Sequence, residues 1–485
     1  MPQIPLQEFW YLLPEGFLLV AGMVLLIGSS VGKGVSSRSA TMFSLAAVAA
    51  TAVLVLWVAS DGPGRPILAG MFVLDNYAVY WKILLLGATA LTAVLSCRFV
   101  EESGYRAGEF FSLLLTATTG MLLMAGGFNL LSIWISLELM ALSSYILAGY
   151  FKFETRSNEA ALKYFVLGAL SSGILLYGMS LLYGATGELG LVEIATALPE
   201  AAKTAPTLIA IGWLMMAIGL FFKVSAVPFH VWTPDVYVGS PTPVTAFLAV
   251  GSKAASFAVL VRIFYQAIPA LAQDWQIITA AVAAVTMIWG NLAALTQNNV
   301  KRMLAYSSIG HAGYILMGVL AMSDDGLWAI LFYTAAYALI TLGTFGTVIL
   351  LERKEYAGET YEDYAGLARR APYLAAMMLL FMLALTGIPP TGGFFGKVYL
   401  FAAAVEAGWT WVAVVGVLTS ALSLYYYFGI VVQMYFKESD ETTPVPLQEP
   451  VLAAAIGFCA LVTLLLGILP GPLVDLAMSS LLPLP

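Results

Sequence analysis

The chain has 485 residues, of which 61% are hydrophobic and only 10% are charged, and its formal net charge is -7. Soluble domains carry about 25% charged residues, so this much apolar surface cannot all be buried in a water-soluble core. No basic run exceeds two residues, which argues against a nucleic-acid partner. The composition predicts an all-α polytopic membrane protein.

Cysteines and histidines offer little support for a metal or haem centre. Cys97 and Cys459 lie far apart in apolar runs, and no Cys-x-x-Cys pair occurs. This argues against iron–sulfur clusters and structural zinc. A bis-histidine haem would need both His230 and His311, the two histidines of the chain. We therefore expect no cofactor and no metal in this chain.

The chain forms a succession of candidate membrane-spanning helices, which we treat as one membrane domain, 1–485. A spanning helix needs about 20 mostly apolar residues, and the sequence offers about 14 such segments. In chain order they are 10–29, 40–60, 75–97, 109–127, 129–150, 160–184, 206–227, 242–265, 276–296, 302–322, 326–351, 372–405, 408–436 and 450–470.

The distribution of lysine and arginine predicts the orientation, because cytoplasmic loops carry an excess of both. If the N-terminus lies outside, the outer loops and flanks hold only Arg65, Lys203 and Arg262. The cytoplasmic loops and flanks then hold Lys33, Arg38, Arg98, Arg106, Lys152, Arg156, Lys301, Arg302, Arg353, Lys354, Arg369, Arg370 and Lys437. We expect both termini on the outer side of the membrane.

Two of the predicted helices are interrupted. The seventh contains Lys223 five residues before Pro228, and the twelfth contains GIPPTGGFFGK (387–397), which ends on Lys397. Non-helical backbone at membrane depth survives only where protein buries it or where it lines a polar cavity. The interrupted helices are five helices apart, which predicts two inverted five-helix repeats: 109–265 (helices 4–8) and 276–436 (helices 9–13).

Charged side chains occur where a membrane makes them costly. Lys253, Glu138 and His311 lie near the middle of predicted helices, and Lys223 and Lys397 lie beside the interruptions. A charge at the bilayer centre costs about 2.5–3.5 kcal/mol on insertion scales. Structural ion pairs remain an alternative, although buried ion pairs stabilise poorly compared with apolar replacements. We interpret these residues as a functional row.

Three further residues are ambiguous. Lys163 lies near the cytoplasmic edge, where it could snorkel and set topology, and Lys82 lies near the outer edge, where lysines usually act as anchors. His230, beside Pro228, is equally compatible with a local hydrogen bond and with a relay role.

The buried residues favour proton transfer over bond-making chemistry. The pKa of lysine falls on burial, and a neighbouring carboxylate raises it again, so a Glu–Lys pair is a tunable proton site. A row of lysines joined by water and a histidine passes protons without a redox cofactor. No activated nucleophile or phosphate loop is apparent in the sequence.

Several stretches resemble one family, and the resemblance covers most of the chain. They are LSIWISLELMALSSYILAGY (131–150), NEAALKYFVLGALSSG (158–173), KVSAVPFHVWTPDVYVGSPTPVTAFLAVGSKAASFAVLVR (223–262), NNVKRMLAYSSIGHAGY (298–314) and GIPPTGGFFGK. The chain resembles the antiporter-like membrane subunits of respiratory complex I, the proton-pumping NADH:quinone oxidoreductase. It is most similar to the N-type, because Lys397 stands where the M-type usually has glutamate, and because the chain ends soon after the fourteenth helix.

The resemblance implies roles for these residues. Glu138 would pair with Lys223, Lys253 would lead toward the centre, and Lys397 would lead to the outer half-channel. Lys163 matches the NEAALKY motif, which strengthens its case, and His311 and His230 are candidate relays. NAD, flavin, iron–sulfur clusters and quinone would belong to other subunits.

The resemblance also implies partners and a location. The partners would be other membrane-arm subunits, including a neighbouring antiporter-like subunit and small membrane subunits, together with lipids. The location would be a bacterial inner membrane. Alternatives are a subunit of a multi-subunit cation/proton antiporter, an inactive spacer of a membrane arm, and a solitary permease.

Overall fold

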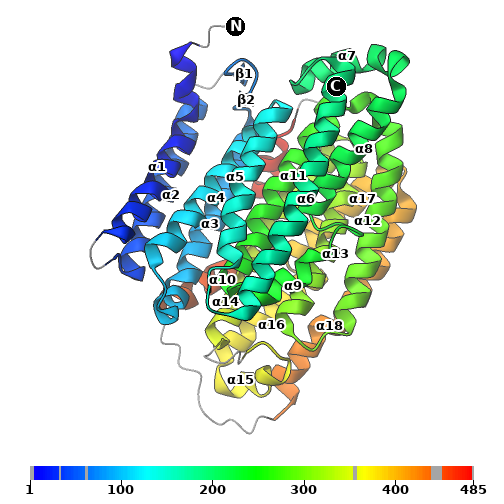
Figure 1. The fold of residues 1–485 in the computed structure, drawn as a ribbon. Coiled ribbons are helices and arrows are strands. Elements are labelled where there is room, and N and C mark those ends of the chain that lie inside the picture. Colours follow the sequence, from blue (N-terminus) through cyan, green and yellow to red (C-terminus); the bar gives the residue numbers. More distant parts are fainter. Residues whose placement is uncertain (1–4, 32–33, 61–63, 353–357, 439–449, 483–485) are drawn as a thin grey trace.

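The structure is a computed structural model that describes residues 5–31, 34–60, 64–352, 358–438 and 450–482, and most of them are helical (Figure 1). Three basic residues used to predict the orientation, Lys33, Arg353 and Lys354, lie outside these ranges.

The first half of the chain contains the following elements: η1 (Leu6–Leu12), α1 (Leu13–Ser30), α2 (Ser37–Ser60), β1 (Pro66–Ile67), β2 (Phe72–Val73), α3 (Asn76–Ser103), α4 (Ala107–Gly126), α5 (Leu130–Ala148), α6 (Thr155–Thr186), α7 (Leu191–Thr204), α8 (Pro206–Lys223), α9 (Trp232–Gly239), α10 (Thr242–Phe247), the π-helical η2 (Leu248–Ser252), α11 (Lys253–Arg262) and the π-helical η3 (Ile263–Ala267). The second half contains η4 (Pro269–Leu271), α12 (Ala272–Leu295), α13 (Val300–Leu320), α14 (Asp324–Leu351), η5 (Glu362–Tyr364), α15 (Leu367–Arg370), α16 (Pro372–Thr386), α17 (Gly392–Glu406), α18 (Thr410–Phe436), α19 (Pro450–Ile468) and α20 (Gly471–Met478).

The described residues include thirteen helices that are long and apolar enough to cross a membrane. The twelfth predicted segment, 372–405, is not among the thirteen, because it is divided into the shorter helices α16 and α17. Large apolar side chains such as Ile27, Leu162 and Leu418 are exposed along these helices. A soluble protein would not expose so many, so the protein is an integral membrane protein with an all-α bundle.

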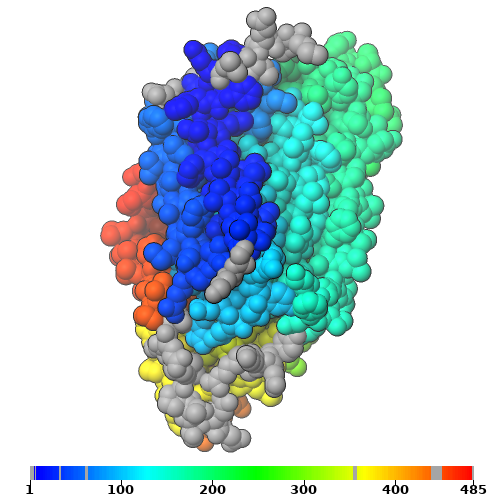
Figure 2. Space-filling model, turned by 60° about the vertical axis from the view of Figure 1, so that its left-hand side comes forward, coloured from blue at the N-terminus to red at the C-terminus, as the bar shows by residue number. Residues whose placement is uncertain are grey.

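The centre of the bundle is formed by three spans, two of which carry Lys253 and His311. The span Thr242–Gln266 is buried over all of its most apolar window, and Val300–Leu320 and Asp324–Leu351 are buried over 94% and 89% of theirs. By contrast, α2 is buried over only 33%. Figure 2 shows α1, in dark blue, on the outside of the bundle along its height.

Both predicted interruptions are present. α8 ends at Lys223, and the chain does not resume a helix until Trp232. α16 ends at Thr386 and is followed by the cap residue Gly387, whose φ of 89° is left-handed. α17 begins after Thr391, whose side chain caps the helix by accepting a hydrogen bond from Phe394 N. The peptide bonds Val227–Pro228 and Pro389–Pro390 are cis. The helix breaks at corresponding positions support the two inverted repeats, 109–265 and 276–436, which remain a prediction.

Sequence patterns did not predict three short elements. They are the β1–β2 hairpin, the amphipathic helix α7 and the terminal helix α20. The hairpin contacts the start of the chain, because Leu68 N donates a 2.5 Å hydrogen bond to Glu8 Oε2. The end of α20 contacts the start of α3, because Asn76 Nδ2 donates to Ser479 O at 3.0 Å. The two chain ends therefore lie at the same end of the bundle, the upper end in Figure 1.

Candidate functional site

Lys253 lies at the centre of the bundle and has only neutral partners. It opens α11 directly after the π-helical turn η2, a distortion that is common at functional sites. Its ammonium donates to Ser308 O at 2.7 Å and to Ser308 Oγ at 2.5 Å. Tyr337 donates to the same hydroxyl at 2.9 Å. Lys253 is 3% exposed, so a buried ammonium is held here by oxygen dipoles alone.

His311 lies one helical turn further along α13 and joins two tyrosines. Its Nδ1 lies 2.5 Å from the Tyr333 hydroxyl, and its Nε2 lies 3.1 Å from the Tyr427 hydroxyl. The Tyr427 hydroxyl in turn contacts Ser307. A neutral imidazole donates from one nitrogen and accepts at the other, so His311 can exchange a proton between its two sides.

Lys397 completes this row at the second interruption. Its ammonium donates to the carbonyl oxygens of Leu385 and Thr386, each at 2.9 Å, and to Ser420 Oγ at 2.8 Å. The two carbonyls are released at the end of α16, where the helix stops. The ammonium also lies 4.7 Å from the centre of the Tyr314 ring. The helix break therefore supplies acceptors for the lysine.

Tyr314 bridges His311 and Lys397, because its ring centre lies 5.6 Å from that of His311. On the other side, the Tyr337 ring centre lies 5.0 Å from His311. Lys253, His311 and Lys397 are thus joined by buried hydroxyl and aromatic side chains. Within the described ranges, the ammonium groups of Lys253 and Lys397 bond only to carbonyl and hydroxyl oxygens.

The predicted pair of Glu138 with Lys223 is not formed in this structure. The Lys223 ammonium donates a long 3.4 Å hydrogen bond to the Tyr145 hydroxyl, and Glu138 accepts a hydrogen bond from Ser172. Tyr145 and Glu138 lie two helical turns apart on α5. Lys223 therefore contacts the Tyr145 hydroxyl, whereas Glu138 contacts the Ser172 hydroxyl. Glu138 is half-buried, whereas Lys223 is only 4% exposed.

Lys223 is linked to Lys253 through aromatic side chains. The rings of Tyr145 and Tyr164 are 4.6 Å apart, edge to face. The Tyr164 hydroxyl interacts with Ser252, the residue before Lys253. The row of predicted lysines therefore continues across the bundle, from the first interruption to the second.

Lys163 belongs to a different environment. Its ammonium lies 2.7 Å from both Glu159 and Asp235, and Asp235 also lies 2.5 Å from Arg302. The Lys163 side chain is 41% exposed. Asp235 lies on α9 and Arg302 on α13, so this ion-pair cluster joins three helices near one end of the bundle.

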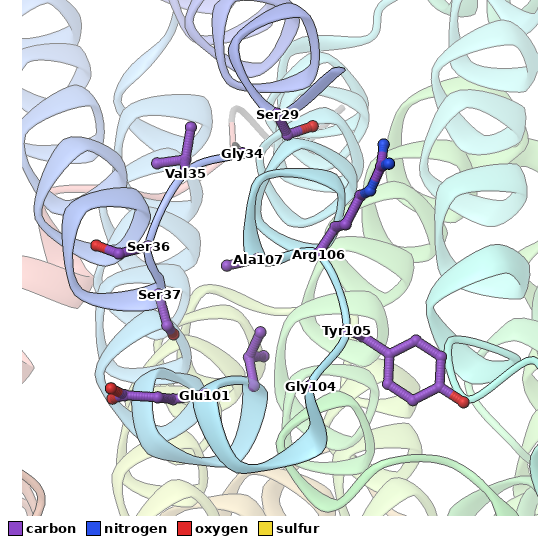
Figure 3. A pocket seen from close by; sticks show the side chains of 11 residues that line it. Ser29, Gly34, Val35, Ser36, Ser37, Glu101, Gly104, Tyr105, Arg106 and Ala107 are labelled. Atoms are coloured by element: carbon purple, nitrogen blue, oxygen red, sulfur yellow. The ribbon is translucent and has the colours of Figure 1, made fainter. Parts of the chain in front are cut away.

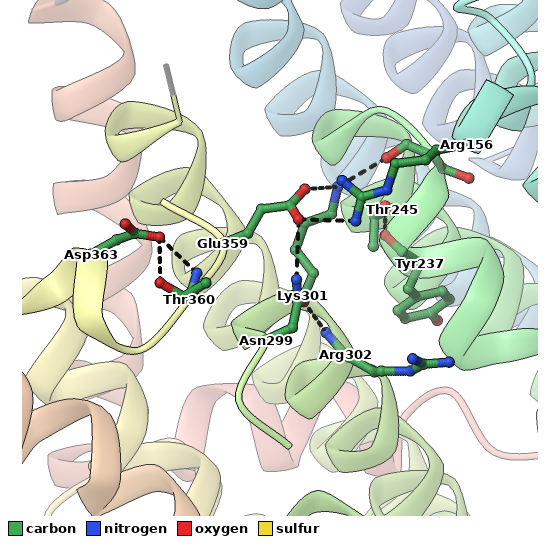
Figure 4. A network of polar contacts seen from close by, with 10 residues as sticks. Arg156, Tyr237, Thr245, Asn299, Lys301, Arg302, Glu359, Thr360 and Asp363 are labelled. Carbon is green, nitrogen blue, oxygen red and sulfur yellow. Dashed lines mark hydrogen bonds and ion pairs between the residues drawn. The ribbon is translucent and has the colours of Figure 1, made fainter. Parts of the chain in front are cut away.

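A second ion-pair cluster at that end centres on the buried Glu359 (Figure 4). Its carboxylate accepts from Asn299 at 3.1 Å and from Arg156 at 3.3 Å, and it lies 3.9 Å from the Lys301 ammonium. Lys301 also donates to Ser240 O at 3.0 Å. The cluster connects the start of α6 and the end of α9 with the start of α13.

His230 is not joined to the row. Its ring packs edge-on to Trp289, with centres 6.3 Å apart, and its Nδ1 is buried without a hydrogen-bond partner among the described residues. A relay role for His230 remains a prediction.

Lys82, interpreted from sequence as an interface anchor, is instead 3% exposed and paired with Glu15. Glu15 and the tyrosines and serines around the row were not predicted from the sequence. The Tyr and Ser residues within predicted spans were a usable signal, but only three-dimensional packing shows which of them face a lysine.

Hollows at the ends of the helices do not involve the row. A cavity of about 360 Å³ lies between the α1–α2 and α3–α4 connections, lined by residues that include Ser36, Glu101 and Arg106 (Figure 3). In the described part of the chain, no group of three or more His, Cys, Asp or Glu residues is arranged to hold a metal ion. The side chains of the row offer proton donors and acceptors in the bundle interior.

Fold and site together define a polytopic membrane protein with a buried row of protonatable side chains. A family profile described as NADH:quinone oxidoreductase/Mrp antiporter, TM, matches residues 127–423. "NADH-quinone oxidoreductase subunit N" of Trichlorobacter lovleyi is 41% identical over 97% of this chain and 96% of its own length. The chain belongs to this family, and within it to the N-type antiporter-like subunits.

Solved structures share the fold. A chain of respiratory complex I from Thermus thermophilus is 35% identical, with a TM-score of 0.80, and the match covers 96% of this chain and all of that one. A chain of the Mrp complex from Dietzia sp. has a TM-score of 0.78 over 98% of this chain and 97% of that chain, at 23% identity. The second likeness concerns the fold alone.

Proposed function

We propose that this chain is a proton-translocating membrane subunit of an NADH:quinone oxidoreductase, driven by quinone reduction elsewhere in the complex. The observation that carries the proposal is the buried row Lys223, Lys253, His311 and Lys397, with its linking hydroxyls. A charged lysine at the centre of a membrane costs about 2.5–3.5 kcal/mol. A merely structural row would have no reason to retain such lysines.

Neutral partners suit the lysines to proton exchange. An ammonium held by carbonyl and hydroxyl oxygens has no opposite charge to keep its proton in place. A change in the distance to a carboxylate then alters its affinity for the proton. Glu138 is that carboxylate for Lys223: in this conformation the two are apart, and their approach would load the lysine.

Protons would then move along the row in short steps. Once the Ser308 and Tyr337 hydroxyls reorient, Lys253 would pass a proton through them to His311, and His311 would pass it toward Lys397. Water molecules that enter the interruptions would complete the contacts that exceed hydrogen-bond length. Lys163 would tune or feed the row from the half-exposed cluster around Asp235.

Partners and location follow from the same proposal. The half-buried Glu138 shares a helix face with the exposed Ile135 and Leu142. A carboxylate on such a face is costly against lipid, so a neighbouring membrane-arm subunit would cover it. The NAD, flavin, iron–sulfur and quinone sites would belong to other subunits. The membrane would be a bacterial inner membrane, with both chain ends on the outer side.

A subunit of a cation/proton antiporter is the second candidate, because an Mrp complex contains a chain of this fold. The higher identity to chains named for NADH:quinone oxidoreductase favours the first candidate. Copurification with redox subunits would support the first and contradict the second.

The test is Lys223→Ala in the purified assembly, reconstituted in liposomes, with subunit content checked by gel. NADH oxidation and proton uptake are measured together. We expect normal assembly with a several-fold loss of proton uptake and of coupled turnover. Lys203→Ala is the control, because Lys203 is a 71% exposed lysine on α7. Normal proton uptake in Lys223→Ala would overturn the proposal.

A further inference from the structure

A second buried carboxylate–ammonium pair lies outside the row. Lys82 Nζ on α3 lies 2.6 Å from Glu15 Oε1 on α1, and the two side chains are only 4% and 3% exposed. Glu15 lies on the buried stripe of α1 with Leu18, Gly22 and Leu25, which faces the bundle. Both residues lie near the end of the bundle that carries the chain ends.

The pair is poorly satisfied as an ion pair. Apart from Lys82, no group in the described ranges donates a hydrogen bond to either oxygen of Glu15. A carboxylate offers about four acceptor positions and an ammonium three donors, so most of them are unused here. Buried ions with so few partners lose much of their advantage over the neutral forms of the same groups.

A neighbouring pair shows the contrasting arrangement. Both oxygens of Asp75 accept from the Arg262 guanidinium, at 2.8 and 2.9 Å, and one also accepts from Ala78 N. Arg262 additionally donates to Ala125 O at 3.3 Å and packs on the Tyr77 ring. An arginine does not lose its proton in proteins, so the Asp75–Arg262 pair stays an ion pair. A lysine and a glutamate can both exchange protons, so the Glu15–Lys82 pair can also exist with neutral members.

The hairpin and η1 enclose the Glu15–Lys82 pair. Ile67, Phe72 and Val73 line the space around it together with Tyr11, and that space has no room for water in this conformation. The hairpin is held by the Glu8 contact and by Ser132, whose hydroxyl donates to Met71 O at 2.6 Å. Opening of the hairpin would let water reach the pair.

We propose that Glu15 and Lys82 form a second proton-exchange site, at the end of the bundle that carries the chain ends. The inference rests on the proposed function in one respect: the exchanged protons are those that the subunit translocates. The other charged or titratable groups around the site are Asp75, Arg262 and Tyr11. Asp75 interacts electrostatically with Lys82.

The exchange balances without any further reactant. The resting pair is a carboxylate and an ammonium. A proton from water enters on Glu15 and Lys82 releases one to water, which leaves a carboxylic acid beside a neutral amine. Transfer of the carboxyl proton to the amine restores the ion pair, so one proton has entered and one has left. The carboxylate is available for this step because nothing but Lys82 holds its charge.

The test uses the complete complex in liposomes. Glu15→Leu/Lys82→Met replaces the pair by apolar groups, which proteins usually tolerate. We expect normal subunit content and a several-fold lower ratio of proton uptake to NADH oxidation. Lys82→Arg is the companion variant, because it preserves a cation that cannot release its proton, and we expect the same loss. Lys203→Ala is the control, because Lys203 is exposed on α7 away from the pair, and we expect its ratio to be unchanged.

The outcomes separate the two proposals. Unchanged uptake ratios in both Glu15/Lys82 variants, with a loss in Lys223→Ala, would overturn the second site and leave the proposed function standing. Unchanged ratios in all three would overturn both. An infrared titration of wild-type and Glu15→Gln complexes gives a readout independent of pumping. We expect a protonated-carboxyl band that Glu15→Gln lacks, and identical spectra would contradict the inference.

Discussion

Lysine side chains have different partners at the centre of the bundle and at the end where α6 begins. At the centre, Lys253 and Lys397 are 3% exposed and are held by carbonyl and hydroxyl oxygens. At the end, Lys163 is 41% exposed and lies between two carboxylates. The first arrangement leaves the proton free to move, and the second fixes the charge and joins helices. A lysine suited to proton exchange is therefore buried and is not held between two carboxylates, as Lys163 is.

The largest effect is expected for Lys397→Met. The substitution leaves Leu385 O without its donor, but Ser420 still donates to Thr386 O at 2.9 Å, so the break retains part of its support. We expect an assembled complex whose proton uptake is reduced several-fold, measured in liposomes alongside NADH oxidation. An assembled variant with full uptake would place Lys397 outside the path.

His311→Gln should come next. Glutamine preserves one hydrogen bond to the tyrosines but cannot pass a proton between Tyr333 and Tyr427. Water can replace part of this transfer, so we expect a loss of uptake smaller than that for Lys397→Met. The measurement is the same uptake assay, with Tyr333→Phe as the companion variant. An effect larger than that of the lysine variant would mean that the histidine, not the lysines, limits transfer.

Lys163→Ala should have a smaller effect on uptake than any central variant. Its two carboxylate partners fix its charge, and exposed ion pairs contribute about 0.2–1 kcal/mol each. Asp235→Asn removes the partner of both Lys163 and Arg302, so it should lower the thermal stability of the complex more than Lys163→Ala does. If Lys163→Ala abolishes pumping in an assembled complex, the distinction between the two regions fails.

Asp75→Asn should affect stability and its pH dependence. Burial alone would raise the pKa of Asp75, but the Arg262 guanidinium holds it below the usual value. A carboxyl whose folded pKa is lowered stabilises the protein above its unfolded pKa, and that contribution is lost as pH falls through the folded pKa. We expect a lower melting temperature for Asp75→Asn at pH 7, and a difference from wild type that shrinks as the pH falls below about 4. A difference that persists unchanged in acid would contradict this assignment.

The sequence predicted the scaffold of the site better than its connections. The proline and glycine clusters located both interruptions, and the improbability of charge in apolar helices located Lys223, Lys253 and Lys397. The partners depend on tertiary packing, so no spacing rule pointed to Tyr145 or to Tyr333. Glu15 was overlooked because a carboxylate in the first turn of a helix usually reaches water, and here the hairpin covers it. Helix α7 was overlooked because its apolar face is too short to resemble a span.

The most direct test of the account is the ratio of proton uptake to NADH oxidation in Lys253→Met, beside Lys203→Ala, in liposomes with matched subunit content. The account predicts a ratio several-fold below wild type for Lys253→Met and an unchanged ratio for Lys203→Ala. An unchanged ratio in both would mean that the buried row does not carry the protons.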